Sequence, residues 1–153
     1  MSLSKTDLKI EVKIFEQLNI CELYELLQLR CEVFVVEQDC VYQDLDGKDQ
    51  KALHIIGTRN DKIVAYTRCF KPGDYFPEAA IGRVVVAEKH RKDGYGHQIM
   101  QASIKAITDT YNTSVIKLSA QTYLIDFYNS HGFQTTGDSY LEDGIPHIAM
   151  IKS

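Results

Sequence analysis

The sequence lacks several features that would assign it to particular protein classes. Its 153 residues contain no tryptophan and only three prolines, and no run of apolar residues is longer than four. Because a membrane-spanning helix needs about 20 apolar residues in succession, we expect no membrane partner. Residues 1–7 lack the apolar core of a secretory signal peptide, so we expect none. The net charge of −4 argues against a nucleic-acid partner, since such proteins usually carry a basic face.

The cysteine and histidine patterns contain no disulfide or metal signature. The four cysteines form no C-x-x-C pair, and the five histidines form no H-E-x-x-H motif and no zinc-finger spacing. Without a secretory signal, a disulfide framework is not expected. The sequence therefore predicts free thiols, no bound metal and a reducing, cytoplasmic location.

Strand and helix patterns alternate along the chain. Period-two alternation and short β-branched runs predict strands, whereas apolar residues at helical spacing predict helices. The expected strands are residues 9–15, 52–58, 63–70, 79–87, 115–120, 134–136 and 147–151. The expected helices are residues 20–34 after the cap residue Asn19, a segment that follows Gly96 and reaches Tyr111, and residues 123–130. The order predicts an α/β fold, and we expect residues 1–153 to form a single domain.

The turn after the fourth expected strand has the composition of an anion site. Arg91-x-x-Gly94-x-Gly96 opens a helix and lies in a stretch with four basic residues, 89–92. Glycines allow close approach to the backbone, and a helix N-terminus presents N–H groups that attract anions. A pyrophosphate would fit there. A plain strand-to-helix turn is the alternative, whereas a dinucleotide-binding loop would need a third glycine that is absent.

Two separated motifs resemble the signatures of GNAT N-acetyltransferases. The first is Val84-Val85-Val86 followed by the glycine loop at residues 91–96, and the second is Phe127-Tyr128-x-x-x-Gly132-Phe133. Residues 29–38, 42–46, 81–84 and 142–147 further resemble the ElaA-like group of that superfamily. Two residues depart from the pattern: Lys92 stands where many GNAT loops have glycine, and Val41 stands where related chains often have proline.

The resemblance implies a single GNAT-like domain with a mixed central sheet, splayed between its fourth and fifth strands and flanked by helices. It implies acetyl-CoA as cosubstrate and transfer of the acetyl group directly to a primary amine. The pantetheine arm would follow Val84, Val85 and Val86, as an added strand does. The pyrophosphate would meet the loop residues Arg91, Lys92, Asp93, Gly94, Tyr95 and Gly96, and Asn129 is a weaker additional contact.

The resemblance also implies a catalytic role for Tyr128 as the general acid that protonates the leaving thiolate. From the residues alone, the favoured interpretation of Tyr128 is a core tyrosine that packs the helix at residues 123–130. Candidates for the general base are Glu37, His54, Glu142 and His147. We select His147 because it follows Pro146 at the start of the last strand, although a structural histidine is the alternative.

Two charged regions leave alternatives open. The acidic segment 39–49 either attracts a cationic acceptor or is a solvated loop. Arg30 and Glu37 either belong to a substrate site or form a buried ion pair.

Other functions also remain open at this stage. One is a non-catalytic module that binds acyl-CoA, and another is acyl-homoserine-lactone synthesis, which the Arg30-x-x-Val33-Phe34 pattern distantly resembles. The sequence fixes neither the amine acceptor nor the choice between a monomer and a homodimer.

Overall fold

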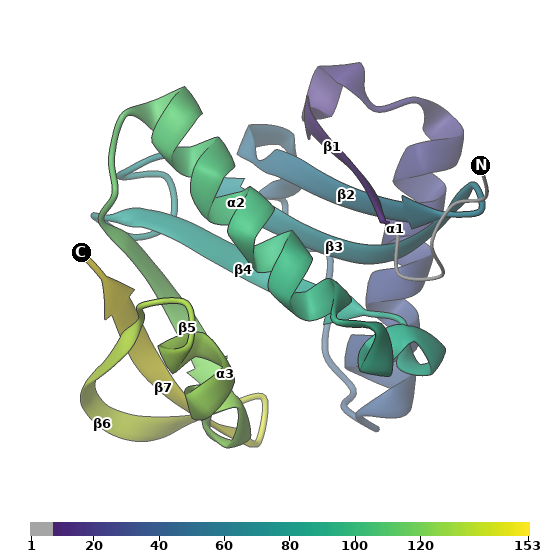
Figure 1. Cartoon of the computed structure of the whole chain (residues 1–153). Coiled ribbons are helices and arrows are strands. Elements are labelled where there is room, and N and C mark those ends of the chain that lie inside the picture. Colours follow the sequence, from purple (N-terminus) through teal and green to yellow (C-terminus); the bar gives the residue numbers. More distant parts are fainter. Residues whose placement is uncertain (1–7) are drawn as a thin grey trace.

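The computed structural model describes residues 8–153, whose strands form one seven-stranded sheet in the order β1-β2-β3-β4-β5-β7-β6 (Figure 1). Only the β4–β5 pair is parallel. The strands are β1 (Lys9–Ile14), β2 (Leu53–Arg59), β3 (Lys62–Phe70), β4 (Ala79–Val86), β5 (Ile116–Gln121), β6 (Gln134–Glu142) and β7 (Ile145–Lys152). The helices are α1 (Ile20–Cys31), α2 (Tyr95–Tyr111) and α3 (Ile125–Asn129).

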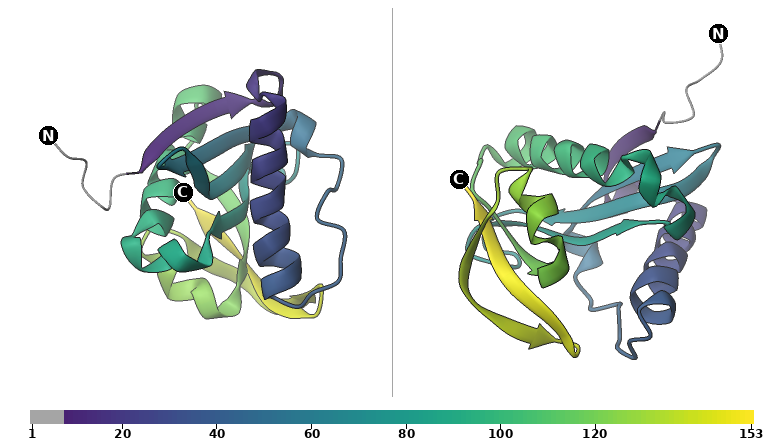
Figure 2. Two further views of the ribbon diagram at one scale, coloured as in Figure 1. Left: turned by 90° about the vertical axis from the view of Figure 1, so that its right-hand side faces the viewer. Right: turned by 60° about the horizontal axis from the view of Figure 1, so that its bottom comes forward.

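The two long helices cover opposite faces of the sheet (Figures 1 and 2). α1 begins where the sequence predicts, because Asn19 accepts a hydrogen bond from the Glu22 N–H at 2.7 Å and Glu22 accepts one from the Asn19 N–H at 3.0 Å. The helical path then continues through a π-helical turn, Glu32–Glu37. The predicted helix to residue 34 is thus confirmed, and the structure extends it by one short turn.

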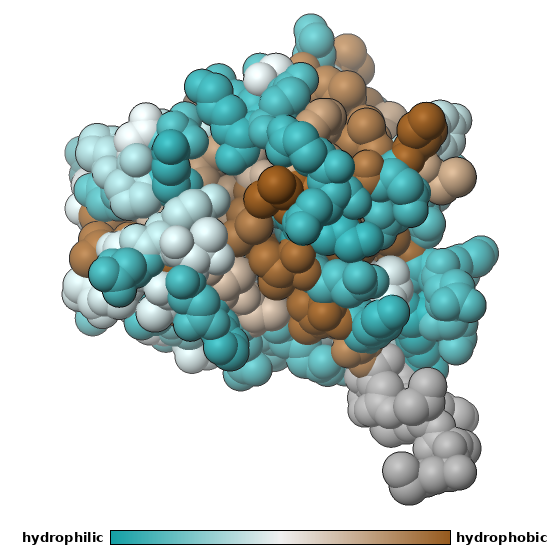
Figure 3. All heavy atoms as spheres, turned by 90° about the horizontal axis from the view of Figure 1, so that it is seen from above, coloured by the Kyte–Doolittle hydropathy of each residue, from teal (hydrophilic) through white to brown (hydrophobic). Residues whose placement is uncertain are grey.

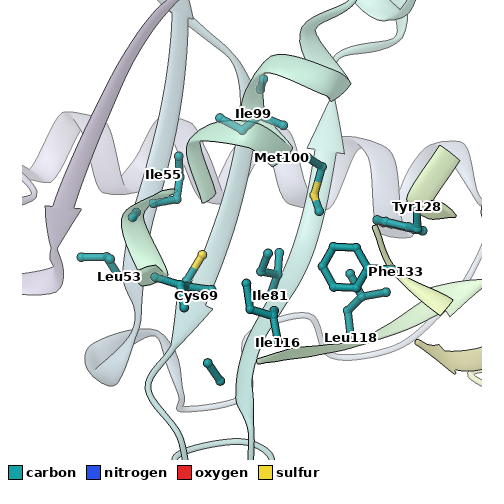
Figure 4. Packing of buried hydrophobic residues seen from close by; sticks show 14 of the residues in the cluster. Leu53, Ile55, Cys69, Ile81, Ile99, Met100, Ile116, Leu118, Tyr128 and Phe133 are labelled. Carbon is teal, nitrogen blue, oxygen red and sulfur yellow. The ribbon is translucent and has the colours of Figure 1, made fainter. Parts of the chain in front are cut away.

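Each face of the sheet has its own apolar cluster. On the α2 side, buried residues from the sheet, including Ile55, Cys69 and Ile81, pack with Ile99 and Met100 of the helix (Figure 4). On the α1 side, Leu26, Leu29 and Val33 pack against Ile56, Tyr66 and Val85 of the sheet. Val85 and its neighbours on β4 therefore contact different faces, as expected for alternating residues in a strand.

The fourth and fifth strands part soon after they meet, which confirms the predicted splay. β4 and β5 pair only at Ala79–Ile116 and Ala80–Lys117. A β-bulge bends β4 beyond this point: Tyr66 pairs with Val85 but Arg68 pairs with Gly82, and Arg83 has a positive φ of 50°. The edge of β4 from Ile81 to Val86 is consequently left unpaired on the β5 side, and it opens a cleft.

The predicted order of elements is confirmed, and two further segments differ from the prediction. The last hairpin is longer than predicted, because β6 runs from Gln134 to Glu142 and is exposed along its whole length. Its residues lack the apolar alternation by which a strand is recognised, and pairing with β7 around the turn at Asp143 and Gly144 defines it instead. The basic turn after β4 is a 3₁₀ helix, Glu88–Asp93.

On the face seen from above, hydrophilic residues surround a band of hydrophobic ones (Figure 3). Among residues 8–153, no helix is both long and apolar enough to cross a bilayer. The expectation about a signal peptide concerns residues 1–7 and lies outside the described part of the chain.

Candidate active site

A pocket of about 130 Å³ lies where β4 and β5 part. Its wall includes residues 80–84 of β4, Leu118 and Ser119 of β5, Tyr128 of α3 and His147 of β7. The structure therefore brings together three residues that the sequence predicts for the site, Val84, Tyr128 and His147. Glu142 also lines the pocket, whereas Glu37, His54 and Asn129 do not.

Tyr128 is both a core residue and a pocket residue. Its side chain packs edge-on against Phe127 and Phe133, with ring centroids 5.1 and 6.2 Å away, and its residue surface is only 5 % exposed (Figure 4). Burial raises the pKa of the Tyr128 phenol, because the phenolate would lose its hydration. The hydroxyl group therefore keeps its proton throughout the neutral pH range.

His147 is held in one orientation by its neighbours. Its Nδ1 lies 2.7 Å from the carbonyl oxygen of Ile145, which can only accept a hydrogen bond, so we assign the proton of the neutral ring to Nδ1. The ring stacks on Tyr140 at an interplanar angle of 22°. Its Nε2 lies 3.5 Å from Oε2 of Glu142. In this tautomer Nε2 has a free lone pair, which is what a general base requires.

The other proposed bases have structural partners. His54 is fully buried, with Nδ1 at 2.6 Å from the Tyr66 hydroxyl and Nε2 at 2.9 Å from the Asp49 carbonyl oxygen. Glu37 forms a bidentate ion pair with Arg91, which lowers the pKa of the Glu37 carboxyl group. Neither group contributes to the pocket wall.

The start of α2 has the form of an anion cradle. Gly94 has a φ of +80°, a left-handed conformation that glycine adopts without strain, and no side chain caps the helix that follows. The first N–H groups of any helix lack partners within it, so they favour a negative charge. A Cβ on Gly96 would lie 3.4 Å from the Phe127 ring, which shows how closely α3 approaches the cradle.

The predicted loop residues differ in what they can offer to a ligand. The side chain of Tyr95 is fully buried and its hydroxyl accepts a hydrogen bond from Arg59 at 3.0 Å, so Tyr95 can meet a ligand only through its main chain. Asp93 contacts Arg59 at 3.4 Å and His90 at 3.2 Å. Lys92 and Asn129 are exposed.

Arg91 is already engaged by the protein itself. Its Nη2 lies 2.8 Å from Oε1 of Glu37, its Nη1 contacts the other carboxylate oxygen, and its Nε donates to the Val86 carbonyl oxygen at 3.1 Å. The hydrogen bonds to Glu37 raise the pKa of the Arg91 guanidinium group. Arg91 thus joins the cradle, the edge of β4 and the end of the π-helical turn.

Of the two alternatives for Arg30 and Glu37, the buried ion pair between them is wrong. Arg30 is fully buried and contacts Asp44 and Asp49, each at 2.8 Å. Arg30 comes from the buried face of α1, whereas Glu37 lies beyond that face on the π-helical turn and reaches Arg91 instead.

The acidic segment 39–49 is not a solvated loop, because an ion-pair network holds it against the sheet. Arg68 contacts Asp46 at 2.6 Å and Asp49 at 3.0 Å, and Arg83 contacts Asp44 at 2.7 Å. With Arg30, three guanidinium groups face three carboxylates. The sequence reasoning missed the two arginines in strands. The available signal was a charged residue within an otherwise apolar strand, which requires a partner when buried.

No group of three or more His, Cys, Asp and Glu side chains in residues 8–153 is arranged to hold a metal ion. All four cysteines are free. The site of the described chain therefore consists of the pocket, the cradle at the start of α2 and the unpaired edge of β4.

Residues 16–153 match the family model described as an acetyltransferase (GNAT) domain. Protein ElaA of Escherichia coli (strain K12) is 45 % identical over 138 residues, which cover 89 % of this chain and 90 % of ElaA. The crystal structure of an acyl-CoA N-acyltransferase from Pseudomonas aeruginosa is 40 % identical with a TM-score of 0.90, covering 96 % of this chain and all of that one.

The acyl-homoserine-lactone synthase LasI shares the fold alone: it is 12 % identical with a TM-score of 0.77, over 95 % of this chain and 89 % of its own. The family match and the 45 % identity to ElaA are similarities of sequence, whereas the likeness to LasI is one of fold. The chain therefore belongs to the GNAT acetyltransferase superfamily and, within it, to the ElaA-like group.

Proposed function

We propose that the protein transfers an acetyl group from acetyl-CoA directly to a primary amine. The observation that carries this proposal is the pocket at the splay of β4 and β5, which Val84, Tyr128 and His147 all line. Family membership supports an acyltransferase, and the acetyl donor, the amine acceptor and the roles of the residues below are our inference.

The residues present suit an acyl-CoA. The unpaired edge of β4 at Val84–Val86 presents main-chain groups to which a pantetheine arm can add as an extra strand. The uncapped N-terminus of α2 and the exposed Lys89 and Lys92 favour a diphosphate. Arg91 already donates to the Val86 carbonyl oxygen, so that carbonyl is shared or released when a ligand binds.

In the proposed reaction, each pocket residue has a separate role. The amine nitrogen attacks the thioester carbonyl carbon, the new C–N bond forms, and the C–S bond breaks. His147 accepts a proton from the amine at Nε2, and Tyr128 supplies a hydrogen bond or proton to the leaving sulfur. A main-chain N–H near Val84 stabilises the oxyanion.

A turnover screen with acetyl-CoA, scored by released thiol, tests this function over amines, amino acids and peptides. We expect turnover with at least one acceptor and calorimetric binding of CoA. Binding without any turnover would favour the non-catalytic module, and the absence of both would refute the proposal.

A substitution at Arg91 tests whether the cradle binds the diphosphate of CoA. Arg91→Glu places a second carboxylate beside Glu37 at the diphosphate site, and we expect CoA affinity to fall about tenfold or more through loss of a charge-assisted contact. Lys105→Glu is the matched control, since Lys105 is exposed on α2 and, among residues 8–153, pairs with Asp109 alone. Unchanged affinity in Arg91→Glu would show that the diphosphate binds elsewhere.

A further inference from the structure

The bulge in β4 inserts one extra residue into the strand at the wall of the pocket. Residues 83 and 84 of β4 both lie opposite a single residue of β3, Thr67. Packing shows the same insertion, because Ile81 joins the apolar cluster on the α2 side and Val85 joins the cluster on the α1 side. In a regular strand, residues four apart share a face. The main chain therefore leaves the regular ladder where it lines the pocket.

The bulge also determines which N–H groups of β4 face the cleft. The N–H of Ala87 donates to the Val64 carbonyl oxygen of β3 at 2.8 Å. Val84 comes three residues earlier, so its N–H points to the opposite edge of β4, which β5 leaves unpaired. Because an inserted residue shifts this alternation by one position, the N–H of Val84 faces the pocket as a result of the bulge.

Arg83 has the backbone conformation on which the bulge depends. Its φ of 50° lies in the left-handed region, which is unfavourable for a residue with a Cβ and which glycine adopts freely. Gly82 directly precedes it, yet the left-handed position falls on the arginine. Such a conformation persists only where the surrounding structure holds it, so we looked for contacts of the Arg83 side chain.

The acidic segment holds this side chain through what we call the Asp44 clamp. Nε of Arg83 lies 2.7 Å from Oδ1 of Asp44, and Nη2 donates to the Asp44 main-chain carbonyl oxygen at 2.8 Å. Nη2 also lies 3.5 Å from Oδ2 of Asp46. The Asp44 side chain is only 3 % exposed, so solvent screens these contacts less than it screens a surface ion pair.

The Asp44 clamp is anchored on the far side of the acidic segment. Oδ2 of Asp44 contacts Nε of Arg30 at 2.8 Å, and Arg30 is fully buried in α1. Arg30 also contacts Asp49 at 2.8 Å. A continuous chain of ion pairs thus leads from α1 through the acidic segment to the bulge of β4.

We propose that Arg83 is a positioning residue that acts through the main chain of Val84. Held by the Asp44 clamp, Arg83 keeps its left-handed conformation and thereby directs the Val84 N–H at the thioester carbonyl oxygen. The inference rests on the proposed function, in which a main-chain N–H near Val84 stabilises the oxyanion. It gives the acidic segment a role in catalysis that requires no contact with either substrate.

Two substitutions separate the conformation of Arg83 from its charge. Arg83→Ala removes the clamp and keeps the Cβ, whereas Arg83→Gly removes both. We expect kcat for acetyl transfer to fall about 100-fold in Arg83→Ala, as for a lost oxyanion donor. Arg83→Gly should recover roughly tenfold of that loss, because the left-handed conformation disfavours a residue with a Cβ by about that factor. CoA lacks the acetyl carbonyl, so its affinity should change little in either variant.

Asn112 provides the matched control for a left-handed residue outside the site. It follows α2 with a φ of 55°, is exposed and does not line the pocket. Asn112→Gly should be more stable to urea than Asn112→Ala, whereas kcat should be the same in both. A change of kcat confined to the Arg83 pair therefore separates positioning from a general effect on stability.

The carbonyl stretch of bound acetyl-CoA reports on the same hydrogen bond without any acceptor. A hydrogen bond to the thioester carbonyl lowers its stretching frequency, and infrared difference spectra with carbonyl-labelled acetyl-CoA isolate this band. We expect the largest shift in the wild-type protein, a smaller one in Arg83→Gly and the smallest in Arg83→Ala. A role of Arg83 in folding alone would leave the band of the folded variants unmoved.

Equal kcat in Arg83→Ala and Arg83→Gly, an unchanged kcat in Arg83→Ala, or a lower kcat with an unmoved carbonyl band would overturn the inference. Turnover by the wild-type protein would still support the proposed function in each case. If Arg83→Ala does not fold, Arg83→Gly decides: glycine adopts the conformation without being held in it, so we expect kcat about tenfold below wild type and a smaller band shift. No change in either quantity overturns the inference.

Two further outcomes concern the proposed function itself. If acetyl-CoA binds and no amine is acetylated, the infrared series decides, and the same band position in all three proteins overturns the inference. Failure to bind CoA and to acetylate any amine would refute the proposed function and this inference with it.

Discussion

Tyr128 occupies a position that is compatible with both interpretations that the sequence left as alternatives, a core residue and a catalytic one. It packs in the core against Phe133 and also lines the pocket. Burial raises its pKa above that of an ordinary tyrosine, and a thiol has a pKa of about 8.5. Complete proton transfer from Tyr128 to a thiolate is therefore uphill, so we expect its hydroxyl to stabilise the developing charge on sulfur mainly as a hydrogen-bond donor.

Replacing this hydroxyl group should affect catalysis and leave binding intact. In Tyr128→Phe we expect kcat to fall about 100-fold, within the usual range for a lost proton donor, with little change in CoA affinity because the ring is retained. The measurements are steady-state kinetics and calorimetry. Tyr111→Phe, half-buried in α2 away from the pocket, is the control. An unchanged kcat in Tyr128→Phe would leave this tyrosine with a structural role alone.

At the scale of the element, the acidic segment 39–49 shows what periodicity and motifs cannot supply. Its aspartates are close together in the sequence, but their partners Arg30, Arg68 and Arg83 come from α1, β3 and β4. Which arginine faces which aspartate depends on how these three elements pack. The sequence offered Glu37 as the partner of Arg30, seven residues away, whereas the actual partners are more distant.

Removing Arg30 should destabilise the whole segment. In Arg30→Met, Asp44 loses a partner and Asp49 keeps only Arg68, so carboxylates stay buried without full compensation. We expect the free energy of unfolding to fall by about 3–5 kcal/mol, measured by urea denaturation. Lys105→Met removes an exposed cation whose pair with Asp109 is worth little, and a change within about 0.5 kcal/mol is expected. A loss below about 1 kcal/mol in Arg30→Met would show that the network adds little to stability.

For the whole molecule, local sequence patterns predicted the order of elements, whereas the resemblance to GNAT proteins implied the splay and the places of Val84 and Tyr128 at the site. The order of elements follows from features that are local in the chain, such as the Asn19 cap and the Gly94 turn. The bulge at Arg83 was not predicted, because its positive φ is imposed by pairing with β3 and by contacts to Asp44. The full length of β6 was missed for a related reason, since only its pairing with β7 defines it.

The same buried groups give the folded protein a defined response to acid. Burial lowers the pKa of His54 below its ordinary value of 6.5. The hydrogen bond from Arg68 lowers the pKa of Asp46 below 3.8, and although burial alone would raise the pKa of Asp49, hydrogen bonds from Arg30 lead to a net lowering. The folded state thus binds these protons at lower pH than the unfolded state, so acid favours unfolding.

We therefore expect the free energy of unfolding to decline in two stages on acidification, the first below about pH 6.5 and the second below about pH 3.8. Urea denaturation at closely spaced pH values measures both. His54→Gln should flatten the first stage whatever it does to stability at pH 8, because the titrating group is gone. His131→Asn is the control: the pKa of His131 is also lowered, by burial and by His97, but the residue is less buried, so its removal should leave most of that stage. If the first stage persisted in His54→Gln and disappeared in His131→Asn, it would come from the pair His97 and His131 and not from the buried His54.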